Sequence, residues 1–524
     1  MQSMPSVMSH NFSRVPNVET PRSTFNRSHG AKLTLESAGQ LVPILVDEVL
    51  PGDSFSVDMA GFARLATPLH PFMDNVRMST HFFFVPNRLI FDNFQKFMGE
   101  QDNPNDSTDY LIPQITAPTG GFAIGSIYDH MGIPTGVEGL KVNALHLRAY
   151  NLCWRDWFRD QNLQDSPPIE KGDGPDNPDD YTLLRRGKRH DYFTSCLPWP
   201  QKGDSVTLPL GDKAPVRANF SDGSGYQGPV TTISGGTNTP IKLFASDGND
   251  NEIYVSDAPP SQHRPLEADL SLATASTVNE LREAFQMQKM MEVAARSGSR
   301  YTEIVRGFFG VTSPDSRLQR PEYLGGGTTN IQVNPIAQTS SSDGTTPQGN
   351  LSAIGTGGFK KHGFNSSFTE HGVIIGLVSI DADLTYQQGL NRMWSRRTKW
   401  DFYWPQLAHL GEQPVLNKEI FADGSASDER VFGYQERFAE YRYKPSTIHG
   451  KMRSSDPQSL DAWHLSQDFD NLPVLDATFI ESNPPLDRVI AVQDEPQFIM
   501  DTYVRMKCTR PMPTYSVPGL IDHF

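Results

Sequence analysis

The sequence predicts a mainly β protein, built as an antiparallel β-sandwich with long loop insertions and a few short helices. Strand-like runs recur along the 524-residue chain, separated by glycine, proline and aspartate, as is typical of antiparallel sheets. Glycine and proline number 42 and 40, together about 16% of the chain, against a usual value of roughly 12%. Hydrophobic residues make up 37% of the chain and include 30 phenylalanines, which is enough to fill a substantial core.

Individual strands can be placed by their apolar runs. Residues 81–99 begin as a strand and pass, after Pro86, into a short helix. The last predicted strand is well placed to close a sheet near the C-terminus. The other predicted strands, in chain order and ending with that one, are 32–37, 41–50, 54–62, 372–380 and 502–510.

Two longer helices are predicted. The apolar residues of the first, 142–159, fall at spacings of three and four and form one stripe: Val142, Leu145, Ala149, Leu152 and Cys153. The second, 278–296, begins with a capping box from Thr277 and Glu280 and ends at Gly298. Its methionines, Met287, Met290 and Met291, suit either a partner groove or core packing, and their helical spacing favours the core.

The chain is predicted to hold one sandwich domain with an arm and two insertions. Residues 1–30 lack apolar periodicity and form an extended N-terminal arm, whose candidate contact residues are Arg14, Arg22 and Arg27. A polar, glycine-rich surface insertion at 205–262 divides the domain into 31–204 and 263–524. A second polar segment, 325–358, is predicted as a loop insertion within the latter part.

Charge and cysteine content exclude several classes of protein. The formal net charge of −15 argues against a protein whose whole surface binds nucleic acid. Cys153, Cys196 and Cys508 are far apart and lack CxxC spacing, which predicts reduced, buried thiols made in a cytosol. No apolar run approaches the roughly 18 residues needed to cross a bilayer, so no membrane span is predicted.

No catalytic motif is present. The glycine-rich segment 355–361 lacks the Gly-Lys-Ser/Thr ending of a phosphate-binding loop. The acidic segment 171–181 breaks EF-hand spacing and is interpreted as a solvated loop rather than a calcium site. We therefore predict a protein that is not an enzyme, with no catalytic residue, no cofactor and no metal site.

One segment, 391–405, combines residue types suited to nucleic acid. Aromatic faces can stack on bases while cations meet phosphates, an arrangement suited to single strands. The alternative is that the aromatics pack in the core, with the arginines paired to carboxylates at a subunit boundary. A second basic run, 185–190, is interpreted as a solvated loop that could also contact DNA or an acidic partner. The candidate DNA contacts are Arg392, Trp394, Arg396, Arg397, Lys399 and Trp400.

Three blocks of sequence resemble a known family. They are HFFFVPNRLIF (81–91), RRGKRHDYFTSCLPWPQKG (185–203) and AARSGSRYTEIVRGFFGVTSPDSRLQRPEYLGGG (294–327), the last being the most specific. These blocks resemble the major capsid protein of the microviruses, small icosahedral single-stranded DNA bacteriophages, and in particular of their gokushovirus branch. The resemblance runs over most of the chain, but 205–262 and 341–358 match no motif.

The resemblance implies a viral jelly roll that assembles, one copy per icosahedral asymmetric unit, into a closed shell around circular single-stranded DNA. It implies as partners a small basic DNA-binding protein, an internal scaffolding protein, a DNA pilot or minor capsid protein, and a bacterial host receptor. It places the protein in the virion, after assembly in the host bacterial cytoplasm. Gokushovirus capsid proteins carry an insertion that protrudes at the threefold axes, for which 205–262 is the candidate. Its candidate tip residues are Asp222, Tyr226, Asn238, Asp247 and Asp250.

The sequence thus predicts a shell subunit that encloses DNA, whose surface insertion serves in host attachment and whose arm laces neighbouring subunits or follows the inner wall. Two other functions stay open. One is a carbohydrate-binding or carbohydrate-hydrolysing β-sandwich, which needs a concave site lined by aromatics and paired acids. The other is a single-stranded DNA-binding module centred on 391–405.

Overall fold

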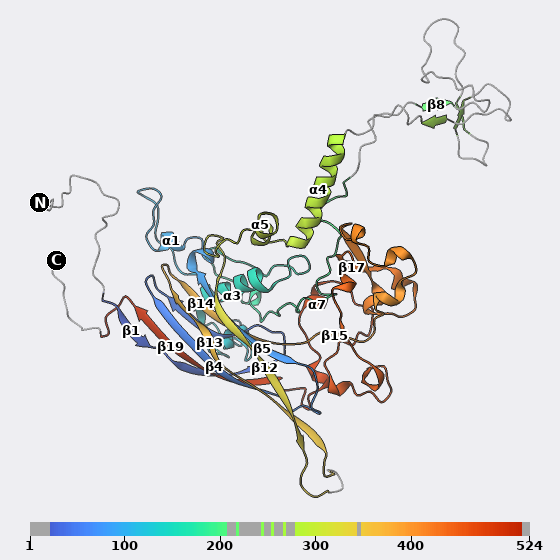
Figure 1. Ribbon diagram of the computed structural model, residues 1–524. Coiled ribbons are helices and arrows are strands. Elements are labelled where there is room, and N and C mark those ends of the chain that lie inside the picture. Colours follow the sequence, from blue (N-terminus) through green and yellow to red (C-terminus); the bar gives the residue numbers. More distant parts are fainter. Residues whose placement is uncertain are drawn as a thin grey trace, which may run out of the picture. The chain divides into compact units, whose positions relative to one another are not determined.

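Most of the chain forms one antiparallel β-sandwich (Figure 1). The computed structural model describes residues 21–206, 278–342 and 347–515, and the backbone of four short strands at 216–218, 243–245, 253–255 and 266–268. Nine strands build the main sheet: β1 Ser23–Asn26, β2 His29–Leu35, β3 Val42–Val49, β4 Ser54–Leu65, β5 Val76–Pro86, β12 Glu322–Ala337, β13 Leu351–Ser367, β14 Gly372–Ala382 and β19 Phe498–Arg510.

The sheet curls because two long strands, β12 and β13, pass from one layer to the other. The strand order is β1-β19-β4-β13-β12-β5-β14-β3, with β2 also paired to β19. The first part of β12 pairs with β5, and its last part pairs with β13. The later part of β13 then pairs with β4. The result is a jelly-roll type of sandwich, with β12–β5–β14–β3 in one layer and β13–β4–β19–β2 in the other.

The space between the two layers holds the main hydrophobic core. Strands β4 and β19 alternate buried and exposed residues, as expected when only one face of a layer is covered. Their inward side chains, among them Met59 and Val504, pack with Phe82 of β5 and Ile374 of β14. All four side chains are almost completely buried.

A second core covers the opposite face of β5 and β14. It contains Phe83, Ile375 and the helix α3 Leu145–Cys153, which continues as a π-helical turn, η2 Trp154–Phe158. The Tyr150 hydroxyl donates to the Leu41 carbonyl oxygen at 2.8 Å and ties α3 to the sheet. Every residue of β14 is therefore buried.

A buried ion pair holds the loops around α3. Arg148 donates to both carboxylate oxygens of Asp176, at 2.7 and 2.5 Å, and both side chains are 2% exposed. Arg148 also donates to the carbonyl oxygens of Ile90 and Gly172, and the Tyr181 hydroxyl donates to Asp176 at 2.6 Å. These bonds satisfy the charges that burial removes from water.

The remaining elements of this unit are short, and several surround a third, smaller core that contains Tyr192, Phe193 and Val415. The remaining helices are α1 Phe94–Phe97, α2 Ile127–His130, α5 Tyr301–Phe309, α6 Asn417–Ile420 and α7 Ala477–Ile480. The 3-10 turns are η1 Asn87–Leu89, η3 Pro178–Asp180, η6 Arg392–Ser395, η7 Lys399–Asp401, η8 Pro405–Leu407, η9 Ala426–Glu429, η10 Ala439–Tyr441, η11 Gly450–Met452, η12 Asp461–Trp463 and η13 Leu486–Arg488. The minor strands are β6 Gln114–Thr116, β7 Lys141–Asn143, β15 Thr385–Tyr386, β16 Glu412–Leu416, β17 Val431–Glu436 and β18 Ser446–Thr447.

Residues 201–297 form a second unit. It contains the helix α4 Val278–Ser297 and two short antiparallel pairs. These are β8 Val216–Ala218 with β11 Leu266–Ala268, and β9 Leu243–Ala245 with β10 Ile253–Val255.

Over the parts of the chain that the structure describes, no helix combines the length and the apolar character needed to cross a bilayer.

Most predicted elements are confirmed. The fold is mainly antiparallel β, the predicted strands correspond to β2, β3, β4, β5, β14 and β19, and β19 closes the sheet beside β4. Both predicted helices are present as α3 and α4, and Gly298 follows α4 with a φ of 101°. All three cysteines are buried and free, as predicted.

Two structural interpretations were wrong. Much of the predicted loop insertion at 325–358 belongs to β12 and β13, because its glycines allow close approach of neighbouring strands instead of marking a loop. The predicted core packing of the methionines fails for Met287 and Met290, which are 40% and 55% exposed. The sheet also begins before residue 30, within the predicted arm, since β1 and the first residue of β2, His29, pair with β19.

Candidate functional site

The segment 391–405 folds as a series of turns whose polar side chains cap them. The Asn391 side chain accepts the Met393 N–H at the start of η6. The Asp401 carboxylate accepts the N–H groups of Arg397 and Thr398 at 2.8 and 2.7 Å, which sets up η7. Pro405 begins η8. The turns η6 and η7 line a hollow of about 650 Å³ together with side chains from β16, α6 and η10.

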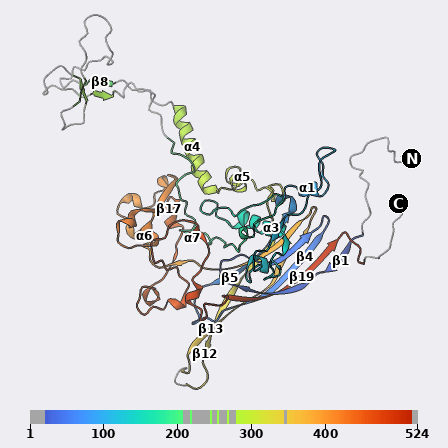
Figure 2. The ribbon, with the colours of Figure 1, turned by 180° about the vertical axis from the view of Figure 1, so that it is seen from behind.

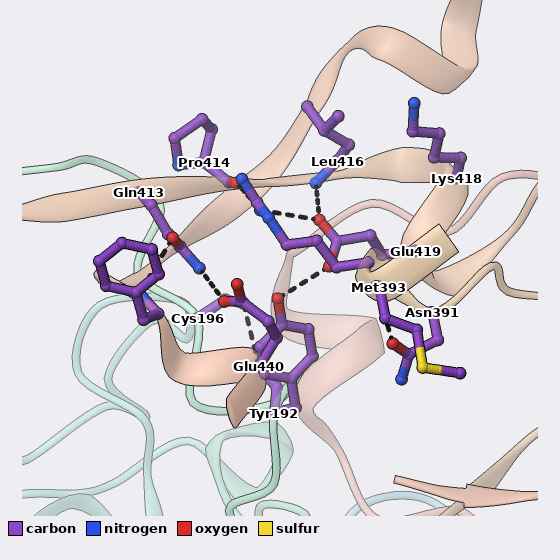
Figure 3. A network of polar contacts seen from close by, with 12 residues as sticks. Tyr192, Cys196, Asn391, Met393, Gln413, Pro414, Leu416, Lys418, Glu419 and Glu440 are labelled. Atoms are coloured by element: carbon purple, nitrogen blue, oxygen red, sulfur yellow. Dashed lines mark hydrogen bonds and ion pairs between the residues drawn. The ribbon is translucent and has the colours of Figure 1, made fainter. Parts of the chain in front are cut away.

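One buried carboxylate organises the floor of this hollow. Glu419 on α6 accepts the Tyr192 hydroxyl at 2.8 Å and the Leu416 N–H at 3.0 Å (Figure 3). Arg392 donates to the same carboxylate at 3.0 Å and to the Pro414 carbonyl oxygen at 2.7 Å. The Glu419 side chain is 3% exposed and the Arg392 side chain 23%.

Burial sets the electrostatics of this carboxylate. Burial raises the pKa of Glu419, and the Arg392 guanidinium and the Leu416 N–H partly offset that rise. Burial together with the Glu419 carboxylate also raises the pKa of the Tyr192 hydroxyl, so the tyrosine remains a donor. Arg392 therefore compensates a buried charge.

A second carboxylate, Glu440, is held in the same way. It accepts from the Gln413 side chain at 2.6 Å (Figure 3). It also accepts from Arg396 at 3.3 Å. The Arg396 guanidinium also lies over the ring of Tyr441, 4.3 Å from its centroid. Two of the six candidate DNA contacts, Arg392 and Arg396, are thus bound within the protein.

The other four candidate DNA contacts are exposed. Trp394 and Trp400 are 72% and 54% exposed, and Arg397 and Lys399 are also exposed. The Lys399 ammonium lies 4.6 Å from the centroid of the Trp400 ring. Core packing of the aromatics is therefore wrong for this segment. Arg392 and Arg396 do pair with carboxylates, but these belong to the same chain and not to a neighbouring subunit.

The hollow is nearly balanced in charge. Its lining includes the basic residues Arg392, Arg396, Arg397, Lys418 and Arg437, against the acidic residues Asp401, Glu419, Glu429 and Glu440. A balanced lining attracts a polyanion weakly. The exposed tryptophan faces are the part of this site best suited to bind a ligand.

The second basic run, 185–190, is not a solvated loop. Arg185 donates to the Ala38 carbonyl oxygen at 2.7 Å and to the Ser37 hydroxyl. Arg189 donates to the buried Asp381 at 2.8 Å, and Lys188 lies over the Phe479 ring. These side chains join segments that are far apart in the sequence, which a run of basic residues cannot reveal by itself.

The acidic segment 171–181 also has a structural role. Asp176 is the buried partner of Arg148, so a solvated loop is wrong for this residue. Asp173 accepts from the Asn93 side chain at 2.8 Å. Within the described ranges, no group of three or more histidine, cysteine, aspartate or glutamate residues could hold a metal ion.

The structure places only part of the predicted arm. Arg22 donates to the Ser54 hydroxyl at 3.4 Å, and Arg27 forms an ion pair with Asp47. Arg14 lies outside the described residues, as do the candidate tip residues Asp222, Tyr226, Asn238, Asp247 and Asp250.

Sequence reasoning missed the acidic half of this site. The residues that surround Arg392 and Arg396 come from separate segments, and no local sequence pattern marks them as partners of these arginines. They are Tyr192, Gln413, Glu419 and Glu440. Helix α5 was not predicted from the sequence either. Its signals are Glu303, whose side chain accepts the Arg300 N–H at 3.1 Å, and Gly310, whose φ of 67° ends the helix.

The fold is a jelly-roll type of sandwich, and comparison with known proteins identifies the family to which it belongs. Residues 13–520 match the phage family described as "Capsid protein (F protein)". The chain belongs to this capsid family. The predicted membership of the microvirus capsid proteins is confirmed, which makes the chain a component of the virion and implies a shell built from many copies.

Three relatives, each described as "Capsid protein VP1", align along almost the whole chain. That of Bdellovibrio phage phiMH2K is 50% identical over 525 residues, which covers 98% of both chains. That of Chlamydia phage 1 is 45% identical over 590 residues, covering 99% of this chain and 98% of the relative. That of Spiroplasma virus 4 is 36% identical over 539 residues, covering 98% and 97%.

Replacement of Arg392 tests its role as the cation that compensates the buried Glu419 carboxylate. Arg392→Gln leaves the Glu419 carboxylate buried without a cation, and we expect a loss of about 2 kcal/mol in the free energy of unfolding at pH 8, less than for a fully buried pair. Without Arg392 the pKa of Glu419 rises further. Protonation then relieves the charge at lower pH, so the loss is smaller at pH 5 than at pH 8.

The measurement is chemical denaturation of the purified subunit at both pH values. Arg397→Gln, at an exposed position of the same segment, is the matched control and changes stability by less than about 0.5 kcal/mol. Equal losses for the two variants, or a loss for Arg392→Gln that is larger at pH 5, would contradict the assigned role.

Proposed function

We propose that this chain assembles, one copy per icosahedral asymmetric unit, into a closed shell around circular single-stranded DNA. The observation that carries the proposal is 50% identity to a phage capsid protein along 98% of both chains. The proposed partners are further copies of the chain, the DNA genome, a small basic DNA-binding protein, scaffolding and pilot proteins, and a bacterial receptor. Assembly takes place in the host bacterial cytoplasm.

The helix α5 supports self-association through its exposed apolar side chains. None of its residues is buried, and Tyr301, Phe308 and Phe309 are 71%, 38% and 76% exposed. Val311, just beyond the helix, is 54% exposed. A contiguous apolar surface of this kind is typical of an interface, and closed symmetry repeats each contact around its axes.

The chain's acidity favours a division of labour in packaging. The chain carries a formal charge of −15, so it does not itself supply the cations that neutralise most of the packaged DNA phosphates. A separate small basic protein supplies most of the cations, while exposed rings of the capsid protein stack on bases. Trp394 and Trp400 are proposed as such stacking residues, with Arg397 and Lys399 close to the phosphates.

The insertion at 205–262 is proposed as the protrusion at the threefold axes and as the part that attaches to the host. Its composition supports an outward position, because a polar, glycine-rich segment needs water or partner loops for its backbone groups. A carbohydrate-binding protein is the alternative, since the hollow lined in part by 391–405 has two tryptophans, Trp394 and Trp400, and four acidic residues.

Electron microscopy of the purified full-length chain tests assembly. We expect small, uniform spherical particles from the wild type. Phe309→Asp places a charge in the proposed interface, so particle yield falls at least tenfold while the unfolding of the subunit is unchanged, because the site is exposed. Thr312→Asp adds the same charge nearby without removing an aromatic ring and is the control.

A soluble monomer that is stabilised by a sugar would overturn the shell proposal in favour of the carbohydrate alternative. Normal assembly of Phe309→Asp would overturn only the interface assigned to α5.

Removal of the exposed tryptophans tests the proposed stacking. We expect Trp394→Ala with Trp400→Ala to weaken binding of a fluorescent oligo-dT by about tenfold or more, because each stacked base contributes about 1–3 kcal/mol. Phe402→Ala, at a neighbouring ring that is 52% exposed, is the comparison. Unchanged affinity of the double variant would exclude stacking at these two residues.

Deletion of residues 222–250 tests the proposed protrusion. We expect particles to form at the normal yield, since the segment is inserted into the sandwich domain, and adsorption to host cells to fall at least tenfold. A deletion variant that assembles and remains as infectious as the wild type would refute host attachment through this segment.

A further inference from the structure

The two layers of the sandwich differ in what covers them. The β5–β14 layer has a hydrophobic core on each face. The layer of β2, β19, β4 and β13 has the main core on one face only, and its strands run side by side in both views (Figures 1 and 2). In β19 every second residue from Ile499 to Lys507 is exposed. We call this exposed surface the free sheet face.

The free sheet face carries a positive charge in an acidic protein. Six basic side chains are exposed on it, against the two acidic residues Asp58 and Asp501. The excess is four positive charges, whereas the whole chain carries a formal charge of −15. The six basic residues are Lys32, Arg64, Lys360, Lys361, Arg505 and Lys507.

The basic residues surround two exposed aromatic rings. Phe62 and Tyr503 are 52% and 51% exposed. They lie diagonally across the β4–β19 pair, because Phe62 stands opposite Asp501 and Tyr503 stands opposite Ala60. Diagonal neighbours of this kind are about 7–8 Å apart. Two bases of one strand can therefore stack on the two rings.

Small residues keep the two rings uncovered. Gly358 stands beside Phe62 on the β13 side, and Gly30 stands beside Tyr503 on the β2 side. A Cβ on Gly358 would lie 4.0 Å from the Phe62 ring, and one on Gly30 would lie 3.8 Å from the Tyr503 ring. Larger side chains at these positions would lean over the rings. A hollow of about 640 Å³ also adjoins this face. It is lined in part by Lys32, Phe62 and Arg64, and by the acidic residues Asp129 of α2 and Asp501.

We propose that the free sheet face binds single-stranded DNA and is the surface of the capsid protein that is directed toward the genome. This inference rests on the proposed function and adds to it the surface and the residues that meet the nucleic acid. Bases stack on Phe62 and Tyr503, and phosphates lie against Arg64, Lys360 and Lys507. Such a platform reads no sequence, because every base has a face that can stack.

Charge and geometry favour this occupant over a second copy of the chain. Two identical faces, each with an excess of positive charge, repel one another. Duplex DNA would meet the cations but would keep its bases stacked internally and leave the two rings unused. The face also differs from the hollow beside 391–405, where basic and acidic residues are nearly balanced.

The test is oligo-dT binding by the purified full-length chain over a series of salt concentrations. A variant with Arg64→Gln, Lys360→Gln and Lys507→Gln loses three phosphate contacts. The slope of log affinity against log salt falls by about 2, and affinity at 0.1 M salt falls by roughly 10- to 100-fold. Phe62→Ala with Tyr503→Ala weakens binding by about 5-fold or more and leaves the slope unchanged.

The matched control removes three exposed charges elsewhere, with Arg282→Gln, Lys289→Gln and Lys451→Gln, and leaves the slope within error of the wild type. The proposal is overturned if the face variants bind DNA as the wild type does. It is equally overturned if the control variant loses as much of the slope of log affinity against log salt. Face variants that keep DNA binding but fail to assemble would also overturn it, because the face would then be a subunit interface. A wild-type chain that forms no particles would instead refute the proposed function.

Discussion

The whole architecture depends on one pair of neighbouring strands, β5 and β14, that is buried on both faces of the sheet. Every residue of β14 is buried, and β5 is almost as completely enclosed. A strand pair of this kind needs an apolar cover on each side. The layer of β4 and β19 provides one cover, and α3 with the loops between β5 and β12 provides the other. The buried Arg148–Asp176 pair secures those loops.

This asymmetry links the fold to function. The helix α3 and the loops next to it cover the β5–β14 layer, whereas no hydrophobic core of the described residues packs against the outer face of β4 and β19. The exposed apolar side chains proposed for self-association lie elsewhere, on α5. A shell subunit needs both kinds of surface, one to meet copies of itself and one to meet what the shell encloses. On this chain the two surfaces differ in charge and lie at different positions.

Sequence reasoning succeeded where a residue pattern reflects one covered face or a fully buried strand. The alternation in 502–510 and the apolar run of 372–380 predicted β19 and β14 correctly. It failed for 325–358, where glycine serves close packing within strands. A Cβ on Gly326 would stand 2.1 Å from the Thr80 carbonyl oxygen, and one on Gly363 would stand 2.0 Å from that of Val57. Composition alone cannot distinguish such glycines from those of a loop.

For the polar residues of the candidate site, too, local sequence allowed only part of the arrangement to be predicted. The cations and aromatics of 391–405 are adjacent in sequence and could be found there. The carboxylates that bind two of these arginines come from α6 and η10, which only the folded chain brings near. The free sheet face was missed for a related reason, since its basic residues are spread over four strands and form a cluster only across the sheet.

The most direct test of this account is a cryo-electron microscopy reconstruction of the native, genome-filled particle. The account predicts a closed shell in which the layer of β2, β19, β4 and β13 lines the interior, with nucleic-acid density against Phe62 and Tyr503. A reconstruction in which that face points to the exterior, or packs against a neighbouring subunit, would contradict it.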